Sequence, residues 1–171
     1  FIWRHDAMTI VTSIVEGDGE VDALPVLLRR VGAWLSPNIG IEISHPIRVR
    51  RDRFLNRDAE FRRHLLLAAA KCGDNGWILI LLDADDDCPS KRGAQILQQA
   101  CDCVPHRRIS VVLANREYEA WFLAAADSLH GKRGFSFDNP QDFEAERPRD
   151  AKGWMKHRMT AGYNPITDQP A

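Results

Sequence analysis

The stretch 79–87 constrains the fold of this chain more than any other. It reads Leu-Ile-Leu-Leu-Asp-Ala-Asp-Asp-Asp, so an unbroken apolar run stops at four carboxylates within five residues. Such a run predicts a strand that is buried on both faces, as strands of parallel sheets are. Folds with parallel sheets bind ligands beyond the carboxyl ends of their strands. We therefore expect this acidic cluster to stand where an α/β protein places its ligand site.

The acidic cluster favours a divalent cation. Four carboxylates this close repel one another near neutral pH unless a positive charge compensates them. Their hard oxygens suit Mg²⁺ or Mn²⁺, and also Ca²⁺, better than zinc. The alternative interpretation is a solvated acidic loop ahead of the next helix.

Composition narrows the class of protein. The 171 residues are expected to form a single domain, 1–171. Lys and Arg (23) nearly balance Asp and Glu (24), so no strong overall field attracts nucleic acid. No apolar run is long enough to span a membrane and no signal peptide is evident, so a cytoplasmic location is expected. The four cysteines lack the spacing of a zinc or redox site, and we expect free thiols.

Strand and helix patterns alternate over residues 8–129, the predicted α/β core. Strands are expected at 9–15, 39–44, 79–82 and 108–113, and helices at 20–35, 56–71, 92–103 and 120–126. Pro25 would lie near the start of its helix, and Asn56 would cap the next. This alternation predicts three layers, with a mostly parallel sheet and helices on both of its faces.

Residues 130–171 break the pattern and are expected to form an irregular C-terminal extension. Residues 131–148 are rich in Gly, Pro and Asp, and only 151–159 suggests a short helix. Long unpatterned segments at the end of a domain are uncommon. Either this extension wraps the core, or the chain is truncated before a last helix.

The basic stretch 47–53 has two interpretations. It alternates apolar and basic residues before becoming wholly charged. A solvated edge strand or loop fits this pattern, and so does an arm that contacts phosphates. We slightly favour the first, because no aromatic residues interleave to stack on bases.

Carboxylates follow three of the predicted strands. They are Glu16 after the first, Asp83, Asp85 and Asp87 after the acidic one, and Glu117 and Glu119 after the last. In a parallel sheet these ends share one edge, so the groups converge if their strands are neighbours. A one- or two-metal phosphoryl-transfer site requires such a set.

We expect Asp83 and Asp85 to bind the metal and Glu16 to act as a ligand or general base, whereas Asp86 would face solvent. The simpler alternative gives Glu16 a favourable place in the first turn of a helix. Glu117 and Glu119 could likewise be capping residues.

Two of these motifs resemble the Toprim fold of topoisomerases, bacterial primases and OLD-type nucleases. They are Glu16-Gly17 after the first strand and Asp83-x-Asp85 after a later one. The resemblance covers about residues 9–120. It implies that Glu16 transfers a proton and that the Asp-x-Asp pair binds Mg²⁺.

The chain more closely resembles an uncharacterised bacterial Toprim-like family, classed as a domain of unknown function. The similar segments are 15–20, 82–89, 114–122, 149–154 and 163–170. This resemblance makes Lys152 a candidate catalytic partner of phosphate. It also makes Gln169 a candidate for lining the site. Further candidate substrate-binding residues are Gly17, Gly19, Glu20 and Arg116.

A small metal-dependent nuclease is the leading functional hypothesis, with DNA, RNA or a nucleotide as substrate. Topoisomerase and primase roles would require parts that are not evident in this sequence. A non-catalytic metal- or nucleotide-binding module that acts through a protein partner is the alternative. A sugar-nucleotide glycosyltransferase, suggested by the string Leu-Asp-Ala-Asp-Asp, ranks third and a haloacid-dehalogenase-type phosphatase fourth. Oligomeric state stays open.

Overall fold

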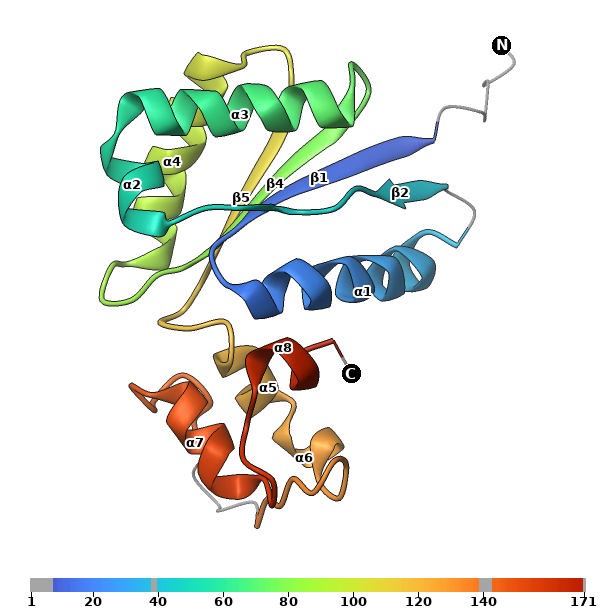
Figure 1. Cartoon of the computed structure of the whole chain (residues 1–171), viewed down its shortest axis with the longest axis vertical. Coiled ribbons are helices and arrows are strands. Elements are labelled where there is room, and N and C mark those ends of the chain that lie inside the picture. The colour runs from blue at the N-terminus through green and yellow to red at the C-terminus, as the bar shows by residue number, and fades with distance from the viewer. Residues whose placement is uncertain (1–7, 38–39, 139–142, 171) are drawn as a thin grey trace.

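Five parallel strands form the centre of the protein in a computed structural model that describes residues 8–37, 40–138 and 143–170 (Figure 1). The strands are β1 (Thr9–Val15), β2 (Ile41–Ile43), β3 (Ile47–Arg48), β4 (Trp77–Asp83) and β5 (Arg108–Ala114). Their order is β2-β1-β4-β5, and β3 also pairs with β1. All of these pairs are parallel, which confirms the predicted α/β fold.

Eight helices accompany this sheet in the described ranges. They are α1 (Asp18–Leu35), α2 (Arg51–Asn56), α3 (Asp58–Cys72), α4 (Pro89–Cys103), α5 (Ala120–Ala124), α6 (Ala126–Leu129), α7 (Ala151–Arg158) and α8 (Pro165–Asp168). Figure 1 shows α2, α3 and α4 on one side of the sheet and α1 on the other. The predicted coverage of both faces is therefore confirmed.

Strand β4 is buried because alternate side chains enter different parts of the core. Ile78, Ile80 and Leu82 lie in the main apolar cluster with residues of α3 and α4, whereas Leu81 contacts the α1 side. Its neighbours in the sheet are β1 and β5. The three strands that end in carboxylates are thus adjacent, which is the condition for those groups to converge.

Three local predictions were wrong. Helix α1 begins at Asp18, so Pro25 lies further inside the helix than expected. Asn56 is the last residue of α2 rather than the cap of the next helix; Arg57 takes an extended conformation and precedes α3. The basic stretch 47–53 is no continuous strand or loop, because it divides into β3 and the start of α2.

The C-terminal extension folds around a second apolar cluster. Its buried members are Leu123, Ala126, Phe135, Phe137, Ala151, Met155 and Met159. Helix α7 matches the predicted helix 151–159 to within one residue. Helix α8 packs against α1, which brings the end of the described chain back to the sheet (Figure 1).

Two further observations concern the described residues alone. None of their helices has the length and apolar character needed to cross a membrane. All four cysteines have free thiols, as expected.

Candidate functional site

The carboxyl ends of β1, β4 and β5 bring acidic side chains to one edge of the sheet. Glu16 directly follows β1, Asp83 is the last residue of β4, and Glu119 directly precedes α5. Glu20 joins them from the first turn of α1. These residues come together because their strands are parallel neighbours.

Three of these groups, Glu20, Asp83 and Glu119, are here called the inner carboxylates. Glu119 is 0% exposed and Glu20 6% exposed. Asp83 is partly buried, and its Oδ1 accepts a hydrogen bond of 2.8 Å from the backbone N–H of Tyr118. Burial of three acids at one sheet edge is unfavourable unless they serve a ligand or share protons.

The C-terminal extension supplies the partners of Glu119. Its Oε1 accepts hydrogen bonds from the hydroxyl of Tyr163 (3.3 Å) and from Nε2 of Gln169 (3.1 Å). Nζ of Lys152 lies 3.8 Å from the same oxygen. Lys152 is held there because Asp150 caps α7, with its Oδ1 accepting a hydrogen bond from the Gly153 N–H.

Two glycines allow this close packing at the start of α1. A Cβ at Gly17 would overlap the Glu20 carboxylate, and a Cβ at Gly19 would overlap the Gln169 amide. The Gly-x-Gly turn after β1 therefore makes room for side chains of the site.

Several polar atoms in this region are buried without a hydrogen-bond partner in the described structure. They are Oε2 of Glu16, Glu20 and Glu119, and Oε1 of Gln169. Buried oxygens normally have a donor or an ion, and each one that lacks it needs an explanation. Four such acceptors make this sheet edge the candidate place for a positively charged or hydrogen-bonding ligand.

Electrostatics support the same conclusion. Burial, followed by the charge of Glu20, raises the pKa of Asp83 to about 7. Burial also raises the pKa of Glu119, and burial together with Asp85 raises that of Glu16. Burial lowers the pKa of Lys152, but Glu119 and other carboxylates outweigh it, so the net pKa is raised and the amine stays charged.

The other three aspartates, Asp85, Asp86 and Asp87, are here called the outer carboxylates. They are exposed, and arginines compensate them. Arg51 lies 3.1 Å from Asp85 and 2.8 Å from Asp87, and Arg92 lies 4.0 Å from Asp87. Arg116 and Arg149 lie 3.9 and 4.0 Å from Asp86.

Arg51 is a residue of this site that the sequence did not single out. It is the first residue of α2, its side chain is only 14% exposed, and its Nε is buried without a partner. It also donates to the Ala84 carbonyl at 3.5 Å. The change from alternating apolar and basic residues to wholly charged ones was the signal, because it marks where a strand gives way to a helix.

The predicted site residues thus separate into two groups. Glu16, Gly17, Gly19, Glu20, Asp83, Glu119, Lys152 and Gln169 lie at or beside the inner carboxylates. Asp85 and Asp87 pair with Arg51, and Arg116 lies beside Asp86, which faces solvent as predicted. Glu117 accepts a hydrogen bond of 3.2 Å from the Lys152 N–H and is partly exposed.

The donor set fits a hard divalent cation, although the side chains are not arranged around one. Among the described residues, no group of three or more Asp, Glu, His or Cys side chains is placed to hold a metal ion. The unpartnered oxygens of Glu16, Glu20 and Glu119 are nevertheless the ligands that Mg²⁺ and Mn²⁺ prefer. Binding would therefore require these carboxylates to turn toward the ion.

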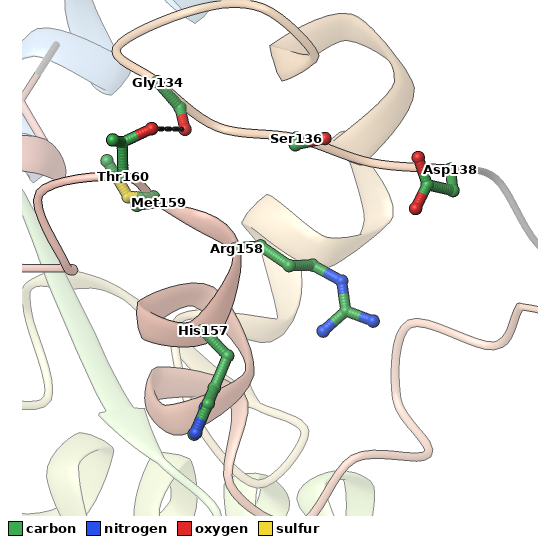
Figure 2. A pocket seen from close by; sticks show the side chains of 7 residues that line it. All are labelled: Gly134, Ser136, Asp138, His157, Arg158, Met159 and Thr160. Atoms are coloured by element: carbon green, nitrogen blue, oxygen red, sulfur yellow. Dashed lines mark hydrogen bonds between the residues drawn. The ribbon is translucent and has the colours of Figure 1, made fainter.

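A hollow that is separate from the strand-end site lies at the opposite end of α7 from Lys152. It lies between the loop around Ser136 and the last turn of α7 (Figure 2). Its volume is about 490 Å³. Thr160 closes one side with a hydrogen bond of 3.1 Å to the Gly134 carbonyl, and Arg158 covers the Trp154 ring at 3.9 Å. None of its described lining residues has a buried polar side-chain atom without a partner, so the candidate site is at the strand ends.

Comparison with known proteins identifies a family but no activity. Residues 15–171 match the model of a family described as a domain of unknown function (DUF4276), and the chain belongs to that family. No curated protein and no solved structure matches the chain significantly. The expected membership of a domain-of-unknown-function family is confirmed, and the matched region contains every candidate site residue.

Proposed function

We propose that this member of the DUF4276 family catalyses Mg²⁺- or Mn²⁺-dependent phosphoryl transfer, as a nuclease that hydrolyses phosphodiester bonds. The observation that carries the proposal is the convergence of Glu16, Asp83 and Glu119 from three adjacent strands, where Glu16 and Glu119 each have a buried oxygen without a partner. A bound divalent ion would polarise a phosphate oxygen there. We also propose that the Toprim resemblance reflects a true relationship, which the order of the acidic motifs along the chain supports.

The residues of the site suit separate tasks in such a reaction. The pKa of Glu16 is raised, so its carboxylate is a stronger base than that of an ordinary glutamate. It can therefore take a proton from an attacking water molecule. Lys152 stays protonated and can bind a phosphate oxygen. Arg51, Arg92 and Arg116 stand around the outer carboxylates, from where their guanidinium groups can contact further phosphates.

Calorimetric titration of Mg²⁺ and Mn²⁺ into metal-free protein tests the proposal first. Saturable binding is expected in the wild type and is expected to weaken strongly in Asp83→Asn. Asp86→Asn is the matched control, because it makes the same chemical change on an exposed aspartate. A screen for cleavage of single-stranded DNA, duplex DNA and RNA with Glu16→Gln follows. Wild-type protein that is folded but binds neither ion would contradict the proposal.

A non-catalytic metal- or nucleotide-binding module is the second candidate. Arg51 favours it, because its guanidinium group pairs with both Asp85 and Asp87 and leaves fewer free carboxylates for a catalytic metal. This candidate predicts that the protein binds the metal but cleaves no substrate. It also predicts that Glu16→Gln leaves the binding function unchanged.

A further inference from the structure

The two faces of the sheet are covered unequally. Helices α3 and α4 pack across β1, β4 and β5 on one face, whereas α1 is the only helix of the described residues that lies along the other. On that second face the β4–β5 half remains open. Leu79, Leu81 and Val112 lie on the walls of a groove of about 590 Å³ that runs beside α1, with Trp77 and Trp121 also lining it.

Exposed apolar residues gather at this groove. Of the eleven large apolar side chains that are exposed in the described ranges, six line it. They are Val31, Leu35, Ile41, Trp77, Val112 and Trp121. Arg108 is the only charged residue among the described lining residues. A nearly uncharged wall disfavours nucleic acid or a charged peptide and is typical of the centre of a protein interface.

Helix α1 is itself incompletely covered. Its buried residues all lie in its N-terminal half, the last of them being Ala23 and Leu24. Its C-terminal half exposes Val31, Trp34 and Leu35, with Trp34 80% exposed. A helix that is apolar on more than its packed face normally buries the remainder against another element.

The apolar area is of the size that a dimer buries. Trp34, Trp77 and Trp121 are 80%, 41% and 37% exposed, which leaves roughly 300 Å² of these three side chains in water, given ~200 Å² for each. A standard interface buries about 800 Å² on each partner. Three residues thus supply over a third of the area that one protomer contributes.

We propose that a second copy of this chain occupies the groove, with the C-terminal half of its α1 packed over β4 and β5. The same face offers an open position of helix size and a helix with uncovered apolar residues. A two-fold axis would cover the open position and the exposed helix together, because each α1 then packs on the open half of the partner's sheet. The interface lies on the face of the sheet rather than at its acidic edge, so it is independent of the proposed function.

Sedimentation equilibrium over a range of concentrations, on the full chain, tests the dimer. Two variants interrupt it from opposite sides: Trp34→Glu on the helix and Val112→Glu in the groove. Each is expected to weaken dimerisation by roughly 100-fold or more. Leu67→Glu is the matched control, because Leu67 is 48% exposed on α3, on the opposite side of the sheet. This variant is expected to dimerise like the wild type.

Quenching of tryptophan fluorescence by acrylamide gives a second readout that does not depend on how the variants fold. In the wild type, quenching should decrease as protein concentration rises, because dimerisation shields Trp34. The proposal fails if the wild type stays monomeric, or if it forms dimers that both glutamate variants leave intact. Dissociation by Leu67→Glu alone would place the interface on the other face and also overturn it.

Discussion

Asp83 and Asp85 are separated by one residue, yet they belong to different electrostatic environments. Asp83 is an inner carboxylate with a pKa raised to about 7, and the one cation acting on it among the described residues is Lys152. Asp85 is an outer carboxylate that is mostly exposed and pairs with Arg51. The difference teaches that the two carboxylates of one Asp-x-Asp motif can be compensated in different ways. The inner side chain is short of positive charge, whereas the outer one already has it.

The largest expected effect compares the same substitution in both regions. On the proposed function, Asp83→Asn should lower metal-dependent cleavage by roughly 100-fold or more, because it removes a charged oxygen at the reacting centre. Asp86→Asn should leave cleavage unchanged. Initial rates at saturating Mn²⁺ measure both. Equal losses in the two variants would show that the distinction between inner and outer carboxylates has no functional meaning.

A smaller effect is expected from removing the cation of the inner region. Lys152→Met should lower the free energy of unfolding by about 2 kcal/mol at pH 8, a value reduced from that of a buried pair because Lys152 is 47% exposed. At pH 5 the loss should be smaller, since protonated carboxylates need less compensation. Urea unfolding of metal-free protein measures it. Lys156→Met, an exposed change on the same helix, should have almost no effect.

The pH dependence of stability sharpens the comparison further. The pKa of Asp83 is raised from 3.8 to about 7, so between these values the folded state holds a proton that the unfolded state releases. Stability therefore falls as pH rises through this window. In metal-free protein, Asp83→Asn should be more stable than the wild type at pH 8, with the advantage gone near pH 4. A wild type that is stabilised on going from pH 5 to pH 8 relative to Asp83→Asn would contradict this sign.

The smallest effects belong to the outer region. Arg51→Met should cost about 0.5 kcal/mol, because Asp85 and Asp87 are 61% and 50% exposed and water solvates them once the arginine is gone. The loss should shrink in high salt, which screens exposed ion pairs. Arg149→Ala, at the edge of the same cluster, should change nothing measurable. Denaturant titrations at two salt concentrations separate these outcomes.

The fold was largely predictable because apolar periodicity is a local property. β1 and β5 lie within one residue of their predicted ranges, and the helices follow the same pattern. The adjacency of β1, β4 and β5 depends on contacts between distant parts of the chain. From the sequence we could say only that the carboxylates converge if these strands are neighbours. The division of 47–72 into β3, α2 and α3 escaped prediction, because tertiary packing of Phe54 and Leu65 outweighs the local capping signal of Asn56.

The grouping of side chains at strand ends was predictable from the sequence, whereas the contacts that other segments make with them were not. The ends of parallel strands are fixed by the sheet, so Glu16, Asp83 and Glu119 could be grouped in advance. The pairing of Arg51 with two aspartates depends on where α2 packs, which no motif specified. The hydrogen bond from Tyr163 to Glu119 likewise depends on the path of the C-terminal extension.

The hydrogen bond between Gln169 and Glu119 joins residues 50 positions apart. During synthesis on the ribosome, the three strands and their carboxylates emerge well before Gln169 does. The region around Glu119 therefore lacks one of its hydrogen-bond donors until translation has passed this residue.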